Sequence, residues 1–75
     1  MPRYFFHIHH GNRHADETGV ELPGKDAAWK EAIFTTGQLL QDLDGALESG
    51  REWRLEVSDE AENPVCIVHV LAERH

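Results

Sequence analysis

The sequence has one cysteine, Cys66, in 75 residues, which excludes an internal disulfide. It has no apolar run approaching the roughly 18 residues of a membrane helix, and no secretory signal at its start. Basic side chains are also few, with seven Lys and Arg against fourteen Asp and Glu, and a formal net charge of −7. Nucleic-acid binding draws its affinity from clustered Lys and Arg, so this composition argues against a nucleic-acid partner. We therefore expect a cytoplasmic protein that binds neither membranes nor nucleic acid.

The length permits one domain, over residues 1–75, and little surplus stability. A chain of this size buries only about 60% of the surface that its unfolded form exposes. Small natural domains usually add disulfides, a metal or a partner subunit to compensate. With disulfides excluded, a metal or self-association is the expected supplement.

Hydrophobic periodicity predicts six extended or helical segments separated by Gly, Pro and Asn turns. The expected elements are strands over residues 3–9 and 14–16, an extended piece over 20–22, a helix over 25–47, and strands over 53–58 and 65–71. The last strand is apolar on both faces, which is typical of a central, covered strand. The predicted fold is α+β, a two-layer β-β-α-β-β arrangement with one long helix packed on a four-stranded antiparallel sheet.

The helix carries the clearest periodic pattern in the chain. Its apolar stripe comprises Trp29, Ile33, Thr36, Leu40, Leu43 and Leu47, widened by Ala28, Ala32 and Leu39. Ser49 and Gly50 are expected to end it. We expect the stripe to pack on a sheet face made of Tyr4, Phe6, Ile8, Trp53, Leu55 and Val57.

Four short motifs resemble a known family in their order and spacing. They are Pro2-Arg3-Tyr4-Phe5-Phe6-His7, Asp16-Glu17-Thr18-Gly19-Val20-Glu21-Leu22-Pro23, the alanine-rich helix start and Glu56-Val57-Ser58-Asp59-Glu60. The chain thus resembles short bacterial proteins grouped as a domain of unknown function, family 6894. The resemblance implies a bacterial protein of this fold with no assigned activity, and it supplies no functional residue. The sequence departs from the family pattern at His9-His10-Gly11, so any histidine chemistry would be a property of this protein rather than of the family. It also has Gly24 where the family tends to place Asp, which is a weaker helix cap.

The histidines suggest one candidate metal site. His7 and His9 are two residues apart on a predicted strand and project from the same face, about 6.5–7 Å apart. His69 would join them if the first and last strands were neighbours. Three histidines with an open position suit zinc, and imidazole also suits nickel. The alternative is that these are solvated histidines on an open sheet face.

Two surfaces are candidate interfaces. Phe5, Ile67 and Leu71 are expected on the sheet face opposite the helix, where a second copy of the chain would cover them. Phe34 and Gly37 lie on the helix side opposite the apolar stripe, as a close-packed partner surface would require. The alternatives are that the sheet residues are singly exposed, and that Phe34 folds under a loop beside an incidental Gly37.

Other groups give no sign of catalysis. The carboxylates close in sequence lie in exposed stretches, where nothing separates their pKa values. Cys66 has no positive neighbour to favour a thiolate, and Ser49 and Ser58 have no histidine partner that the sequence identifies. We therefore expect no catalytic residue and no enzyme. The expected function is a small interaction module that self-associates as a homodimer, with another protein as a further candidate partner; the alternative is a histidine-rich protein that binds zinc or nickel.

Overall fold

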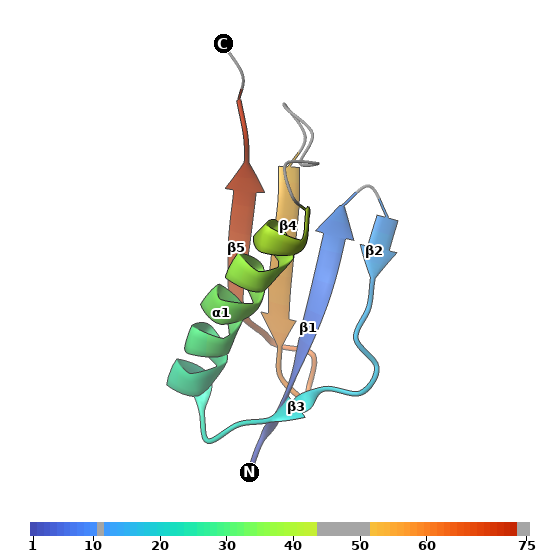
Figure 1. Ribbon diagram of the computed structural model, residues 1–75. Helices are drawn as coiled ribbons and strands as arrows, with labels where there is room; N and C mark the ends of the chain where they lie inside the picture. The colour runs from blue at the N-terminus through green and yellow to red at the C-terminus, as the bar shows by residue number, and fades with distance from the viewer. Residues whose placement is uncertain (11, 44–51, 74–75) are drawn as a thin grey trace.

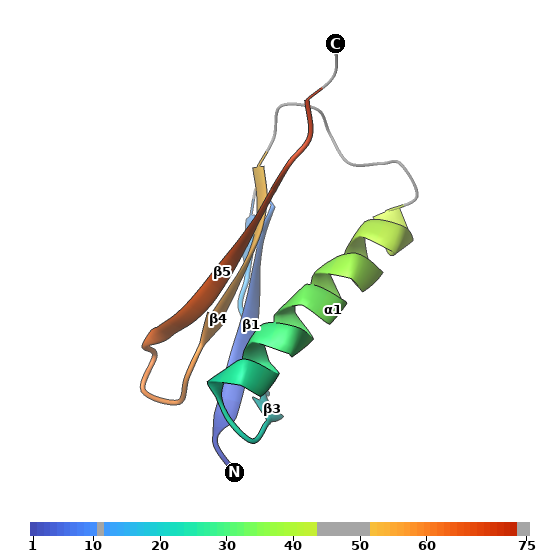
Figure 2. The same ribbon diagram turned by 90° about the vertical axis from the view of Figure 1, so that its left-hand side faces the viewer.

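The computed structural model describes residues 1–10, 12–43 and 52–73 as one helix against one face of an antiparallel sheet (Figure 1). The two layers separate clearly when the molecule is turned on its side (Figure 2). The elements are β1 (Arg3–His10), β2 (Asn12–His14), β3 (Val20–Glu21), α1 (Lys25–Leu43), β4 (Glu52–Ser58) and β5 (Pro64–Leu71). This arrangement confirms the predicted α+β fold.

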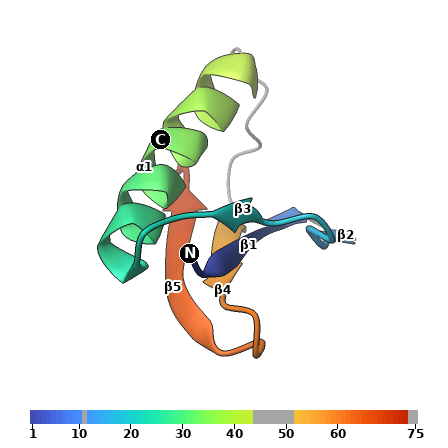
Figure 3. The same ribbon diagram turned by 90° about the horizontal axis from the view of Figure 1, so that it is seen from below.

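The main path of the sheet runs β2-β1-β4-β5, and every pairing along it is antiparallel. The short β3 pairs with the other end of β1, on the same edge as β2. Viewed from below, β3 lies beside β1 and leads into the helix (Figure 3). The second strand spans residues 12–14 rather than the expected 14–16, because Asp16 turns away to bond backbone groups of β1 and of its own loop.

The helix begins where the sequence predicts. The Ala28 N–H donates to the Gly24 carbonyl, the first bond of the helical ladder, and Asp26 places a negative charge in the first turn. The predicted helix end at Ser49 and Gly50, like Leu47 of the stripe, lies outside the described residues. No helix in the described part of the chain combines the length and apolar character that a membrane crossing requires.

The sheet residues of the core are those that the sequence predicts, whereas the helix is rotated about its axis relative to the predicted orientation. Tyr4, Trp53, Leu55 and Val57 are buried, with Phe6 and Ile8 partly buried beside them. On the helix, Ala28, Ala32 and Thr36 are buried, while Trp29 and Ile33 are exposed by 52% and 47%. The large residues Tyr4 and Trp53 fill the sheet side of the interface, so small helical residues face them and allow the layers to approach.

The position of β5 contradicts the sequence expectation. Its two apolar faces predicted a central strand, but β1 and β4 are central and β5 is at the edge. The helix lies over β5 and β4 (Figures 1 and 2). Side chains such as Val68 and Val70 are therefore only partly buried beneath it.

Candidate functional site

Two places gather side chains that could act. One is a polar niche beside β1, formed by His7, Asp16 and Ser58. The other is the open edge of the sheet along β5.

The polar niche joins three parts of the chain. His7 of β1 and Ser58 of β4 are both buried, and their Nε2 and Oγ atoms lie 3.0 Å apart. The Asp16 backbone N–H donates to His7 Nδ1 over 3.0 Å. These groups form one wall of an open cavity of about 450 Å³ whose other polar lining residues are Glu17, Glu56 and Glu62.

The direction of these hydrogen bonds is opposite to that of a Ser-His catalytic pair. Because Nδ1 of His7 accepts a hydrogen bond from a backbone N–H, the neutral ring carries its proton on Nε2, and this N–H donates a hydrogen bond to Ser58 Oγ. A catalytic histidine must instead accept the serine proton at Nε2. The niche therefore holds β1, β4 and the Asp16 loop together and does not activate Ser58. Sequence reasoning missed this cluster because His7 and Ser58 are 51 positions apart.

The Asp16 carboxylate organises the loop between β2 and β3. Its Oδ1 accepts the backbone N–H groups of Thr18 and Gly19, and its Oδ2 accepts that of Phe6 on β1. Burial alone would raise the pKa of Asp16, but the N–H groups of Gly19, Phe6 and Thr18 and the nearby His7 hold this pKa below its usual value. The loop is thus fastened to the outer edge of β1 by an ionised side chain.

Gly19 allows this loop to lie close to β1. Its φ is +74°, and a Cβ there would approach Arg3 Cγ to 2.8 Å and Phe5 Cε1 to 2.9 Å. Arg3 fixes the same region, since its guanidinium donates to the Thr18 carbonyl and to Glu21. Residues 16–23, the second motif of the family resemblance, therefore cover one edge of β1.

The structure does not bring the candidate metal ligands together. Both His7 ring nitrogens are engaged in hydrogen bonds, and β4 separates His69 from β1. Arg54 lies in register between His9 and His69, so those histidines are two strand spacings apart, about 9–10 Å. His69 pairs with Glu52 at 2.9 Å. Across the described residues, no group of three or more His, Cys, Asp or Glu side chains could hold a metal ion.

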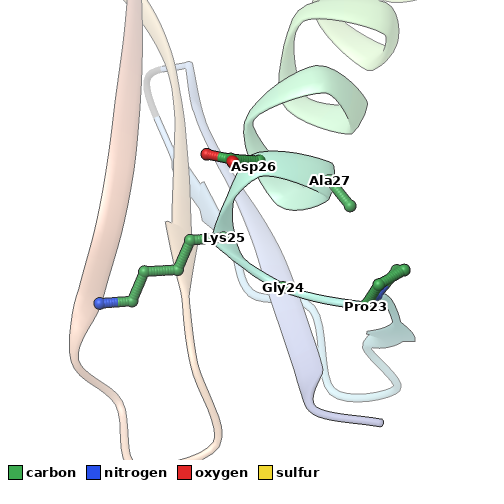
Figure 4. Close-up of a pocket in the computed structure, with 5 residues that line it drawn as sticks. All are labelled: Pro23, Gly24, Lys25, Asp26 and Ala27. Carbon is green, nitrogen blue, oxygen red and sulfur yellow. The ribbon is translucent and has the colours of Figure 1, made fainter.

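A hollow of about 590 Å³ lies at the start of the helix, lined by residues 23–27 (Figure 4). All of its lining comes from five consecutive residues, so no second element contributes a side chain to a site there. The side chains around this hollow show how the first turn of the helix is oriented. Lys25 and Asp26 point to the side on which β5 lies, and Pro23 and Ala27 point the other way (Figure 4).

The outer sheet face is not one apolar patch. Phe5 is half-buried on β1, whereas Ile67 and Leu71 are exposed on β5 by 42% and 55%. Glu56 lies between β1 and β5 in register with Ile67, and separates the two groups. On the helix, Phe34 is 62% exposed and Gly37 is exposed, so these residues are available on the side away from the sheet.

Exposed apolar side chains instead gather along the β5 side of the molecule. Trp29 follows Lys25 by four residues and Asp26 by three, so it continues the helix side that points toward β5, and Ile33 follows it by four. Leu40, 37% exposed, lies on the same row. We call Trp29, Ile33 and Leu40 the helix ridge. The sequence analysis placed these residues in the core because their spacing is helical. Ala28 and Ala32, each one position before Trp29 and Ile33, are the residues that face the sheet, and they were the sequence signal of the observed helix orientation.

The edge of β5 beside this ridge is unpaired in the described part of the chain. The strand has eight residues with no Asp, Glu, Lys or Arg, and its proline is the first residue. The one irregularity in its pairing with β4 lies between Val57 and Ser58, at the start of β5. Charges, internal prolines and bulges are the usual protections of an edge strand, and the stretch from Cys66 to Leu71 has none of them.

The comparisons with known proteins assign a family but no activity. A family model described as a domain of unknown function (DUF6894) matches residues 3–72. The chain belongs to this family. Searches of curated proteins and of solved structures returned no match. The match covers the niche, the Asp16 loop and β5, so all these features lie within the DUF6894 domain.

Proposed function

We propose that this DUF6894 chain is a non-enzymatic interaction module that self-associates, and that the open edge of β5 carries the association. The observation that supports it is that residues 66–71 of the edge strand β5 are mostly apolar and have none of the usual protections of a sheet edge. A second copy of the chain would pair with this edge and cover Ile67 and Leu71.

The small core supports the same proposal. Of the large side chains in the described residues, only Leu55 and Val57 are fully buried. Trp29, Ile33 and Leu71 are each about half exposed, although burying a side chain of this kind contributes about 1.5–3 kcal/mol. A partner on the β5 side would bury several of them at once, and thereby supply the stability that so short a chain lacks.

The chemistry of the niche supports a non-enzymatic role. The buried Ser58 Oγ accepts a hydrogen bond from the His7 Nε2–H rather than donating one to this ring. Burial also raises the pKa of the Cys66 thiol, which disfavours a nucleophilic thiolate. Neither side chain is prepared for attack on a substrate.

The test is the mass in solution, measured by multi-angle light scattering over a range of micromolar concentrations. The wild type is expected to be a dimer, and Ile67→Lys a monomer, because a lysine on an edge strand opposes pairing. Val20→Lys is the matched control: Val20 is 43% exposed and Ile67 42%, but Val20 lies on β3 at the opposite edge. A wild type that is monomeric at every concentration would overturn the proposed function.

Phe34→Asp forms a further arm, since Phe34 lies on the exposed helix back. It is expected to leave the dimer intact. A dimer that Phe34→Asp disperses and Ile67→Lys does not would place the association on the helix back and remove the β5 edge from the proposal.

A further inference from the structure

Two hydrogen bonds of β1 show which way its backbone groups point. The Arg3 N–H donates to Glu60, just after β4, and the Phe6 N–H donates to Asp16 on the opposite side of the strand. Backbone direction alternates along a strand, so the odd-numbered residues of β1 bond to β4 and the even-numbered ones face its outer edge. The two bonds agree on this alternation from opposite sides of β1.

The same alternation extends through β4 to β5. Phe6 is opposite Val57, so the N–H and C=O of Val57 point to β5, where Cys66 lies opposite. The bulge in the pairing of β4 with β5 lies before Cys66, and Val65 is the residue that it leaves without a partner. From Cys66 to the end of the strand the register is constant.

Three residues of β5 therefore face the open edge with their backbone groups. Val68 and Val70 bond to β4, so the alternating residues Ile67, His69 and Leu71 point away from it. Each of the three has one N–H and one C=O available to a neighbouring strand. A partner strand that satisfies all of them must present three such residues in matching positions.

Two identical edges match when they run antiparallel. In an antiparallel pair, two residues whose groups both face the partner strand lie directly opposite and exchange two hydrogen bonds. A two-fold axis perpendicular to the sheet produces this arrangement and makes each contact occur twice. We infer that two copies of the chain pair β5 with β5 in antiparallel orientation about such an axis at His69; this rests on the proposed self-association.

The hydrogen bonds select the position of the axis. With the axis at His69, Ile67 is opposite the second copy's Leu71, and the two His69 residues are opposite each other. All three edge-facing residues of each copy then exchange both of their hydrogen bonds. An axis at Val68 or Val70 pairs only two of the three, and an axis at Ile67 or Leu71 pairs only one.

The side chains agree with the same axis. Ile67 and Leu71 are the exposed apolar side chains on the outer face of β5, and this axis sets them opposite each other on both sides of it. On the helix side, Val68 is opposite the second copy's Val70. An axis at Val68 would instead set Ile67 opposite His69, and would separate the two exposed apolar side chains.

The two His69 side chains do not oppose this pairing. Opposite residues that exchange hydrogen bonds have Cα atoms about 5.5 Å apart. Each His69 Nδ1 lies 2.9 Å from Glu52 Oε1 on its own β4, so the ring is held toward β4 and away from the axis. The Glu52 carboxylate also offsets the charge that the ring carries when it is protonated.

The slope of the helix leaves room for the second copy. The first turns of α1 lie beyond β5 on the side away from β4, and its last turns lie over β4 (Figures 1 and 3). The two-fold axis keeps both helices on one face of the joined sheet and reverses their direction. At each end, the start of one helix therefore faces the end of the other, which has moved away. Trp29 and Ile33 of the helix ridge would face the second copy.

Disulfide trapping tests the axis, in a Cys66→Ala background that removes the native thiol. His69→Cys, Ile67→Cys and Leu71→Cys are prepared and oxidised separately, and Ile67→Cys is also mixed with Leu71→Cys after dissociation and reassociation. Directly opposite residues have Cβ atoms about 4.5–5.5 Å apart, near the range of a disulfide. His69→Cys alone should form linked dimers about tenfold faster, or more, than Ile67→Cys alone or Leu71→Cys alone, whereas the mixture of these two should link. Non-reducing electrophoresis follows the linking.

The trapping pattern and the mass in solution fail separately. Fastest linking of Ile67→Cys alone or of Leu71→Cys alone would move the axis to that residue and overturn the inferred one. Val20→Cys in the same background is the control for random collision, because Val20 is as exposed as Ile67 but lies on β3 at the other edge. A dimer by light scattering in which no sample links faster than this control would overturn pairing at His69, while the proposed self-association stands.

A measurement on the unmodified chain gives the same answer without a substitution. In a mixture of isotope-labelled and unlabelled chains, nuclear Overhauser contacts between the copies are separated from contacts within one copy. The inferred axis predicts contacts between copies from the Ile67 methyl groups to those of Leu71, and from Val68 to Val70. Contacts from Ile67 to the His69 ring in place of Leu71 would move the axis to Val68 and overturn the inference.

Discussion

The two edges of this sheet differ, because one is covered and the other is open. On the β1 side, β2, the Asp16 loop and β3 together cover the outer edge of a single strand. Between the two short strand pairings, the Asp16 carboxylate accepts the Phe6 N–H. On the β5 side, the outer edge of a strand with no Asp, Glu, Lys or Arg is left unpaired in the described part of the chain. An open apolar strand edge is a template on which another strand can pair, and a covered edge is not. Three substitutions or additions test this contrast.

The largest effect on stability is expected from Gly19→Val, which disrupts the loop that covers the outer edge of β1. A β-branched residue is strained at a φ of +74°, and its Cβ would lie within 3 Å of Arg3 and Phe5. We expect the free energy of unfolding to fall by about 3 kcal/mol or more, measured by urea denaturation. The control is Gly24→Ala, since a Cβ at Gly24 meets no atom within 4 Å and its φ is not in the left-handed region. Equal stability of Gly19→Val and the wild type would show that the loop is not held against β1.

An intermediate effect is expected from Asp16→Asn, which preserves the shape of the loop. One oxygen is retained for Thr18 and Gly19, but the amide NH₂ group cannot accept the Phe6 N–H. Leaving this donor unsatisfied is expected to cost about 1–3 kcal/mol of unfolding free energy. Glu17→Gln, at an exposed neighbouring position, is the control and should change little.

The difference in unfolding free energy between the wild type and Asp16→Asn is expected to depend on pH. The pKa of Asp16 is lowered in the folded state, so its ionised form stabilises the fold above the unfolded pKa of about 3.9, and this stability is lost as the pH falls through the lower folded value. The stability difference between wild type and Asp16→Asn should therefore be full near pH 6 and should shrink below about pH 4. A difference that stays constant to pH 2 would contradict an ionised Asp16 in the folded state.

The smallest effect is expected from zinc. His7 is occupied by its two hydrogen bonds, and His69 is separated from β1 by β4, so excess zinc or nickel at neutral pH should leave the melting temperature of the chain unchanged. A native-state ligand would raise it. A rise that His7→Ala, His9→Ala and His69→Ala together abolish would restore the histidine site and with it the metal-binding alternative.

Several parts of the fold could be predicted from residue patterns because they depend on local geometry. Alternation fixed the strands around Tyr4 and Leu55, and both residues are buried as expected. The helix starts at Lys25 as its flanking Pro23 and Gly24 indicate. The candidate interface residues Ile67, Leu71 and Phe34 are also exposed as expected, although their role remains a prediction.

Other parts could not be predicted because they depend on which segments meet. A strand that is apolar on both faces fits the centre of a sheet and also an edge that a partner covers, and only the pairing of β1 with β4 places β5 outside. The rotation of the helix depended on Tyr4 and Trp53, whose bulk favours alanines opposite them. The hydrogen bonds of His7 came from residues 9 and 51 positions away.

The sequence by itself determined the order of strands and helix along the chain and the α+β class, because the periods of 2 and 3.6 are properties of neighbouring residues. Tertiary structure alone decided that β1 is enclosed, that His7 is buried and occupied, and that β5 is exposed along one edge. The physical reason is that a strand's second neighbour is chosen by long-range pairing, which leaves no periodic trace in the strand itself.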